Sequence, residues 1–277
     1  MIGIFDSGLG GLTILKSILA YETAAPTCCL SKYNYLYLGD NARMPYGNKS
    51  QAEIYSYTKE AVDFLFSQGC KLIIIACNTA SSEALKKIQQ EYLPAKYPDK
   101  KVLGVIRPLV EEAVKFDKIK RVGVLGTRAT IESGAYVREL HKLKPDWKIY
   151  QQAAPLLVPL IEEGWAKKPE TKMILKKYLR PLKTKQAQIL IPACTHYPFL
   201  FTEINRLMTN RCVVLNPGEI VAKSLADYLQ RHLELNIRPA KNPTLKFYTT
   251  GGVDKFKESG NKFLNKEIKN IEKISFS

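Results

Sequence analysis

The chain has 277 residues, of which 45% are hydrophobic, which excludes a disordered protein and suits one large domain or two of ordinary size. No stretch reaches the roughly 20 apolar residues that a membrane span needs, and the start resembles no secretory signal, so we expect a cytoplasmic protein with no membrane partner. The net charge of +16 would suit an anionic partner such as nucleic acid. The basic residues are scattered and lysine outnumbers arginine, however, so a solvated lysine-rich surface is the simpler interpretation.

Strand-like apolar runs alternate along the chain with amphipathic stretches of helical period. In chain order the predicted elements are strand 2–5, helix 12–20, strand 33–40, helix 50–68, strand 71–76, helix 81–92, strand 101–106, helix 108–116, strand 121–127, helix 130–142, strand 148–155, helix 156–164, helix 172–183, strand 187–193 and strand 212–217. Continuous apolar strands separated by helices indicate an α/β fold with mostly parallel sheets covered on both faces.

Two pairs of similar segments suggest two similar α/β domains. "IGIFDSGLGGLT" matches "VGVLGTRATIESG", and "KLIIIACNTAS" matches "AQILIPACTHYP". The polar, proline-containing stretch 91–101 follows three strand–helix units and is interpreted as a linker. We therefore expect a first domain of residues 1–100 with the tail 216–277 packed back on it, and a second domain of residues 101–215.

Six cysteines are too few for a disulfide scaffold in a chain of this length, so free thiols in a reducing compartment are expected. Cys70 and Cys212 are interpreted as small buried side chains. The adjacent pair Cys28–Cys29 falls in a predicted loop and lacks metal-ligand spacing. Cys77 and Cys194 differ from these four because each ends a buried-looking strand and precedes small polar residues.

Polar side chains follow the predicted strands at the end where open parallel sheets bind ligands. If the two domains face each other, these motifs share one cleft and Cys77 can meet Cys194 across it. The motifs are Asp6–Ser7, Asp40–Gly47, Cys77–Asn78–Thr79, Thr127 with Thr130, and Cys194–Thr195–His196.

Two opposed cysteines suit the inversion of a carbon centre that bears a hydrogen. One thiolate removes the proton from one face, and the other thiol delivers a proton to the opposite face. The free thiol, with a pKa of about 8.5, needs local assistance for this task. Structural burial of both cysteines is the alternative. A zinc site formed by Cys77, Cys194 and His196 lacks a CxxC spacing, and "FDSGLGG" fits neither common phosphate-loop pattern.

Seven segments in order make the chain similar to the glutamate racemases of the aspartate/glutamate racemase superfamily, from Gly3 to about Phe256. They are "IGIFDSGLGGLTIL", "YLGDNARMPYGNKS", "IIIACNTASSEAL", "VGVLGTRATIESGAY", "PLLVPLIEEG", "CTHYPFL" and "FYTTG". The resemblance implies two α/β domains with the active site between them. It also implies cofactor-independent, metal-free interconversion of L- and D-glutamate, which supplies D-glutamate for bacterial peptidoglycan.

The resemblance also implies roles for individual residues. Cys77 and Cys194 would be the two catalytic acid/bases, with Asp6 assisting Cys77 and His196 assisting Cys194. Glu162 would be a further carboxylate near the second cysteine, although the adjacent Glu163 leaves the register open. The expected substrate contacts are Asp6, Ser7, Tyr46, Gly47, Asn78, Thr79, Thr127, Thr130, Thr195 and His196.

Three other functions compete with this one. A racemase of the same superfamily acting on aspartate or another amino acid would keep both cysteines. A basic binding protein that contacts nucleic acid or DNA gyrase would lose binding steeply with salt and would tolerate Cys→Ser changes. A metal-dependent hydrolase would be abolished by chelation. The family resemblance further implies a homodimer with glutamate as its small-molecule substrate.

Overall fold

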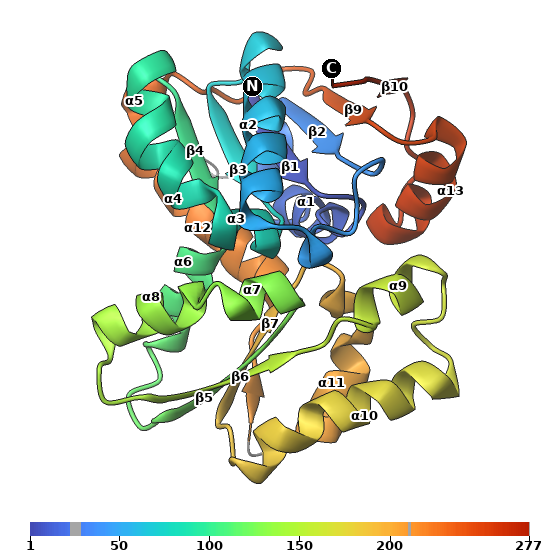
Figure 1. Ribbon diagram of the computed structural model, residues 1–277. Coiled ribbons are helices and arrows are strands. Elements are labelled where there is room, and N and C mark those ends of the chain that lie inside the picture. Colours follow the sequence, from blue (N-terminus) through green and yellow to red (C-terminus); the bar gives the residue numbers. More distant parts are fainter. Residues whose placement is uncertain (23–28, 210–211, 277) are drawn as a thin grey trace.

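The computed structural model describes residues 1–22, 29–209 and 212–276, and it contains two parallel β-sheets, each flanked by helices (Figure 1). The predicted α/β class is therefore confirmed. The two sheets lie one above the other in Figure 1, and α6 (Ile106–Ala113) and α12 (Pro217–Arg231) pack against each other between them. The carboxyl ends of the central strands of both sheets point toward the region where the two halves meet, and this arrangement positions the candidate site.

The first sheet has six parallel strands in the order β10-β9-β2-β1-β3-β4. Its strands are β1 (Ile2–Asp6), β2 (Tyr35–Gly39), β3 (Leu72–Ile75), β4 (Lys101–Gly104), β9 (Leu245–Thr249) and β10 (Ile271–Lys273). Side chains alternate between the two faces. Ile2 and Ile4 belong to the core that includes α1 (Leu12–Leu19), α12 (Pro217–Arg231) and α13 (Val253–Leu264), whereas Phe5 belongs to the core under α2 (Gln51–Ser67).

The second sheet has four parallel strands in the order β6-β5-β7-β8. Its strands are β5 (Arg121–Gly126), β6 (Lys148–Ala153), β7 (Ile189–Ala193) and β8 (Val213–Val214). Val122 and Val124 face the core of α6 and α8, and Leu125 faces the core of α10. The helices of this half are α6 (Ile106–Ala113), α7 (Arg128–Glu132), α8 (Ala135–Leu143), α9 (Leu157–Glu162), α10 (Pro169–Thr184) and α11 (Phe201–Met208).

The predicted boundary between the two halves differs from the observed topology. Strand β4 pairs with β3 and is the edge of the first sheet, so the chain crosses to the second sheet after residue 104 rather than before residue 101. The first half of the stretch interpreted as a linker is helical and ends with α5 (Leu93–Lys96), which has Pro94 in its first turn, and the rest leads by a turn into β4.

The helix after the first cysteine begins earlier than predicted. α3 (Asn78–Glu83) starts directly after Cys77, and α4 (Leu85–Lys87) and a π-helical turn (Ile88–Tyr92) continue it. Asn78 and Thr79 therefore lie in the first turn of a helix rather than in a loop. Short 3₁₀ turns complete the element order at Leu30–Lys32, Tyr46–Asn48, Tyr197–Leu200 and Leu233–Leu235.

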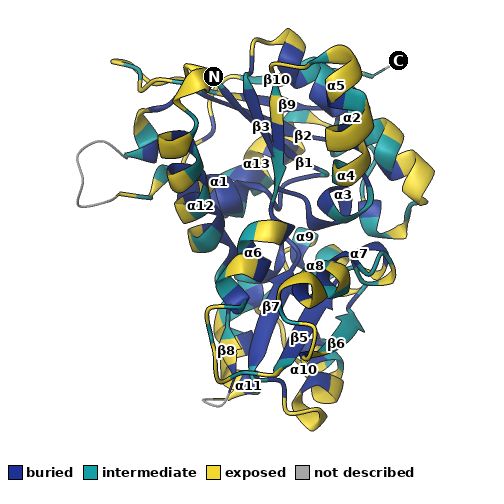
Figure 2. Ribbon diagram, turned by 90° about the vertical axis from the view of Figure 1, so that its left-hand side faces the viewer, coloured by how far each residue is buried: buried dark blue, intermediate teal, exposed yellow. Residues whose placement is uncertain are grey.

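The C-terminal part returns to the first half. Helix α12 packs against α1 and α6 and contacts β7, as Figure 2 shows from the side, and it links the two halves. Strands β9 and β10 then extend the first sheet beside β2. No described helix is both long enough and apolar enough to cross a membrane. Four described cysteines are buried free thiols and Cys29 is half-buried, whereas Cys28 lies outside the described residues.

Candidate active site

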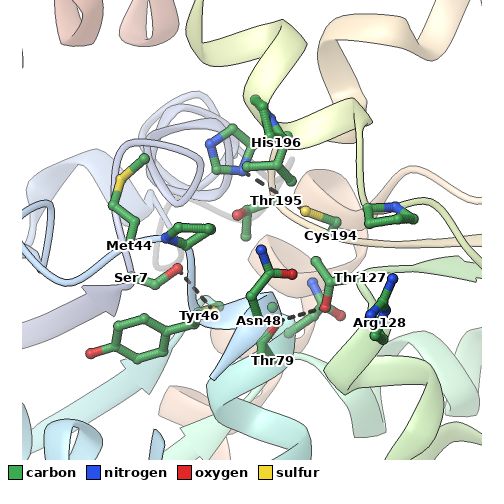
Figure 3. A pocket seen from close by; sticks show the side chains of 17 residues that line it. Ser7, Met44, Tyr46, Asn48, Thr79, Thr127, Arg128, Cys194, Thr195 and His196 are labelled. Atoms are coloured by element: carbon green, nitrogen blue, oxygen red, sulfur yellow. Dashed lines mark hydrogen bonds between the residues drawn. The ribbon is translucent and has the colours of Figure 1, made fainter. Parts of the chain in front are cut away.

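One pocket between the two halves collects most of the residues singled out in the sequence (Figure 3). Side chains from the ends of β1 and β3 approach it from the first sheet, and those after β5 and β7 approach it from the second. The predicted residues that line it are Ser7, Tyr46, Gly47, Cys77, Asn78, Thr79, Thr127, Cys194, Thr195 and His196.

Cys77 enters the pocket because β3 ends just before it. The residue has extended backbone angles and is the N-cap of α3, where its Sγ accepts a hydrogen bond from the Ala80 N–H at 3.5 Å. Ser7 Oγ is hydrogen bonded to the same sulfur at 3.3 Å. Burial first and the negative charge of Asp6 second raise the pKa of the Cys77 thiol to about 12, against the effect of the Ser7 and Ala80 contacts. Cys77 is therefore a neutral thiol at neutral pH.

Cys194 has a different environment, formed by a buried ion pair. It follows β7, is 5% exposed, and its Sγ lies 3.8 Å from His196 Nδ1. The other ring nitrogen of His196 contacts Glu162 at the end of α9. Burial alone would lower the pKa of His196, but the Cys194 and Glu162 contacts outweigh it and raise that pKa to about 10. His196 is therefore an imidazolium at neutral pH, between a carboxylate and the sulfur.

The raised pKa of His196 predicts a pH dependence of stability. Because the folded chain keeps this proton up to about pH 10 while the unfolded chain loses it near 6.5, the stabilisation is complete below pH 6.5 and is lost as the pH rises toward 10. We expect the free energy of unfolding to fall between pH 6.5 and 9, measured by urea denaturation. The free energy of unfolding should change less steeply with pH over this window in His196→Asn than in the wild type. Equal slopes in the two proteins would contradict the raised pKa of His196.

Asp6 lies behind the pocket rather than in its lining. Its carboxylate accepts hydrogen bonds from the Gly8 N–H at 3.0 Å and from the Thr195 hydroxyl at 3.2 Å, so it connects the first half to the Cys194 turn. Burial raises the pKa of Asp6, and the charge of His196 and the backbone N–H groups of Gly11 and Gly8 oppose this rise. The direct side-chain partner of the Cys77 sulfur is thus Ser7, and Asp6 acts on that sulfur through its charge.

Hydroxyl groups from both halves meet on the other side of the pocket. The Oγ1 atoms of Thr79, Thr127 and Thr130 lie 2.9–3.2 Å from one another, and Thr127 is also the N-cap of α7. Tyr136 donates a hydrogen bond to Asn78 Oδ1 at 2.6 Å. These contacts join the first turn of α3 to the second half, and the buried Thr130 supports Thr79 and Thr127 without lining the pocket.

Tyr46 and Gly47 occupy a loop that a buried carboxylate anchors. Asp40 accepts hydrogen bonds from Tyr46 OH, from Arg43 Nε at 2.7 Å and from the Thr250 hydroxyl at 2.7 Å. Thr250 belongs to the "FYTTG" segment after β9, so the returning tail supports this loop. A Cβ at Gly47 would lie 2.8 Å from Thr127 Cβ, which explains why the loop approaches the second half so closely at a glycine.

The sequence interpretation missed several lining residues. They are Met44, Pro45, Asn48, Arg128, Pro155, Val158 and Pro159. Met44, Pro45 and Asn48 lie inside the quoted "DNARMPYGN" segment, so their neighbours Tyr46 and Gly47 could have indicated them. Among the described residues, no group of three or more His, Cys, Asp or Glu side chains could hold a metal ion, so the zinc-site alternative finds no support in the geometry.

Gly10 offers a test of how closely the two halves must approach. A Cβ there would lie 2.3 Å from Thr195 Oγ1 and 2.5 Å from His196 Nδ1, so Gly10→Ala must displace the Cys194 turn. We expect a folded protein whose turnover falls by about 100-fold, because small misplacements of reacting groups have effects of this size. Gly252→Ala is the matched control, since nothing lies within 4 Å of its Cβ position. Equal turnover of the two variants would contradict the observed packing.

Comparison with known proteins places this site in a family of amino-acid racemases. Residues 15–225 match the model of the Asp/Glu/Hydantoin racemase family. The chain belongs to this family. Its relatives include the glutamate racemase of Oceanobacillus iheyensis, 38% identical over 93% of this chain and 89% of the relative, and that of Aquifex aeolicus, 42% identical over 83% of each. The resemblance drawn from the sequence is thus confirmed.

Solved structures agree with this assignment. The glutamate racemase isoform RacE1 of Bacillus anthracis has a TM-score of 0.90 and 32% identity, covering 100% of this chain and 97% of that one. The Francisella tularensis glutamate racemase in complex with D-glutamate has a TM-score of 0.86 and 36% identity, covering 99% and 97%. The aspartate racemase of Picrophilus torridus, at 18% identity and a TM-score of 0.55, shares the fold alone.

Proposed function

We propose that this protein is an isomerase that interconverts L- and D-glutamate with two cysteines and no cofactor. The observation that carries the proposal is the presence of two buried thiols with contrasting neighbours in one pocket between the two sheets. Cys77 is held as a neutral thiol, and Cys194 lies beside a protonated imidazole. The two sulfurs therefore have different surroundings before substrate binds.

The proton transfers follow from this arrangement. In one direction the Cys194 sulfur, as thiolate, takes the proton from Cα, and the Cα–H electron pair remains on carbon as a carbanion-like centre. The Cys77 thiol then gives its proton to the opposite face, which leaves Cys194 as thiol and Cys77 as thiolate. In the other direction the two exchange roles. His196 and Glu162 balance the charge at Cys194, while Ser7 and the Ala80 N–H stabilise the Cys77 thiolate when it forms.

The polar side chains around the sulfurs would hold the amino acid. Asn78, Thr79 and Thr195 lie directly after the two cysteines, where their side chains and N–H groups can bind the α-carboxylate. Negative charge develops on that carboxylate in the transition state, so donors placed there lower the barrier. Ser7, Tyr46, Gly47 and Thr127 complete the pocket, and Asp6 and Thr130 act from behind it.

A direct comparison of glutamate with aspartate tests which amino acid is the substrate. Pure protein is incubated with L-glutamate, D-glutamate, L-aspartate and D-aspartate, and optical rotation is followed. The proposal expects rotation to decay to zero from both glutamate enantiomers and much more slowly from aspartate. Rapid decay with aspartate alone would replace glutamate by aspartate in the same chemistry. Decay with neither would contradict a racemase function and favour the binding-protein alternative.

The family resemblance extends the proposal to the setting of the enzyme. We infer a cytoplasmic homodimer that supplies D-glutamate for peptidoglycan. Light scattering on the purified chain tests whether it is a dimer. Contact with nucleic acid or gyrase is not favoured. A salt-sensitive shift of labelled DNA that survives Cys77→Ser would contradict this expectation.

A further inference from the structure

The pocket contains a cation that the proposed proton transfers do not use. Arg128 is the first residue of α7, directly after Thr127, and its exposed side chain lines the pocket (Figure 3). No ion pair of Arg128 is present within the described residues, although the chain is rich in such pairs elsewhere. Its guanidinium is therefore available to a ligand.

The remaining charges around the pocket are already matched. His196, the other cationic side chain of the lining, is bound to Glu162 and Cys194. Arg43 stands beside the loop, but it is bound to Asp40 and Glu60. Asp6 lies behind the pocket and accepts hydrogen bonds from Gly8 and Thr195. Apart from the two cysteines, whose charge alternates in the proposed proton transfers, the other lining residues are uncharged, so Arg128 is the cation of the described pocket that lacks an anionic partner.

Glutamate brings more negative charge than the sulfurs and their neighbouring donors can match. It has two carboxylates and one ammonium, and its Cα must lie between Cys77 and Cys194 for the proton transfers. The α-carboxylate then meets the Asn78, Thr79 and Thr195 donors beside the sulfurs. The side-chain carboxylate extends away from Cα toward the rest of the lining, where Arg128 is the cationic side chain without an anionic partner. A guanidinium offers paired N–H groups in the geometry of a carboxylate.

We propose that Arg128 binds the side-chain carboxylate of the substrate and thereby selects an acidic amino acid with a long side chain. The proposal rests on the proposed two-cysteine function and adds a specificity determinant to it. Since the side-chain carboxylate stays charged in both enantiomers and throughout the proton transfers, Arg128 contributes equally to ground-state and transition-state binding. Such uniform binding affects KM and leaves kcat unchanged.

The experiment compares the wild type with Arg128→Gln, Arg128→Lys and the control Arg180→Gln. Arg180 is exposed on α10, outside the pocket, and its loss changes the net charge equally. Arg128→Gln should raise KM for L- and D-glutamate by about tenfold with kcat within twofold of the wild type, as expected for one charged hydrogen-bonded contact. Arg128→Lys should recover part of this loss, and Arg180→Gln should resemble the wild type.

Two further measurements separate a specific contact of Arg128 with the substrate from the effect of the protein's overall positive charge. The wild-type kcat/KM should fall with added salt, and this dependence should be weaker in Arg128→Gln but not in Arg180→Gln. The Kd of D-glutamate, measured by calorimetry, should rise by the same factor as KM, which tests Arg128 without turnover. An equal Kd in the wild type and Arg128→Gln, or a fall in kcat with unchanged KM, would overturn the proposal. If the Kd of D-glutamate depends on Arg128 as expected but the wild type racemises neither enantiomer, the two-cysteine function is contradicted and the role of Arg128 in binding is not.

Discussion

Replacing either Cys77 or Cys194 by serine should reduce racemisation from both enantiomers by about 1,000-fold or more, the upper range for loss of a positioned acid or base. Serine keeps the shape of cysteine, but its hydroxyl is a far weaker acid and its alkoxide does not form at neutral pH. Both residues are needed in each direction because one removes the proton that the other replaces. Initial rates from L- and D-glutamate measured by circular dichroism provide the check.

A matched control separates chemistry from the general loss of a thiol. Cys29 is half-buried, lies outside the pocket and has its sulfur 3.0 Å from Ser31 Oγ, so Cys29→Ser should keep the wild-type rate. The binding of D-glutamate should also persist in Cys77→Ser and Cys194→Ser, since both side chains are of similar size. A serine variant that retained a tenth of the wild-type rate would rule out that cysteine as an obligatory acid or base.

The buried ion pair of His196 and Glu162 should be the next most sensitive feature. His196→Asn removes the positive charge 3.8 Å from the Cys194 sulfur and should lower kcat by about 100-fold to 1,000-fold. Glu162→Gln keeps the shape of the side chain but removes the negative charge that holds the proton on His196. This change should lower kcat by about tenfold to 100-fold, as loss of an orienting partner does. Initial rates across pH 6 to 10 distinguish the two effects.

The direction of the pH effect follows from the pKa of His196. Glu162 contributes to raising that pKa to about 10, so without it the pKa is lower and the imidazolium is lost sooner as the pH rises. Glu162→Gln should therefore move the alkaline loss of activity to lower pH. Glu163→Gln is the matched control, because Glu163 is exposed and His196 contacts Glu162 instead. If the loss of activity at high pH shifted in Glu163→Gln and stayed in place in Glu162→Gln, the pairing of His196 with Glu162 would be contradicted.

Most of the site was readable from the sequence because the strands end where the chemistry is. The apolar runs of β1, β3, β5 and β7 are continuous, and a parallel sheet brings the residues after each run to one edge. The order of these runs places Cys77 and Cys194 at the ligand-binding edges of their own sheets, and the further expectation that the two domains face each other places them in one cleft. The family resemblance then added Glu162, which lies on α9 and follows no strand.

The remaining features depend on contacts between distant segments. The pairing of β4 with β3 is a tertiary contact, and a proline-containing polar stretch before it was typical of a linker. The early start of α3 was missed because Asn78 and Thr79 are weak helix formers and cysteine is an unusual N-cap. Arg128 follows a predicted strand, but only the closure of the two halves brings its side chain to the pocket.

The central claim is that two different groups serve the two faces of Cα, and isotope transfer tests it most directly. L-Glutamate carrying α-protium is incubated with the wild-type protein in deuterated water, and both enantiomers are analysed at early times. The account predicts D-glutamate that is deuterated at Cα from the start, while the remaining L-glutamate keeps most of its protium. Early D-glutamate that retained α-protium from the substrate would mean that a single base returns the same proton, and it would contradict the two-cysteine mechanism.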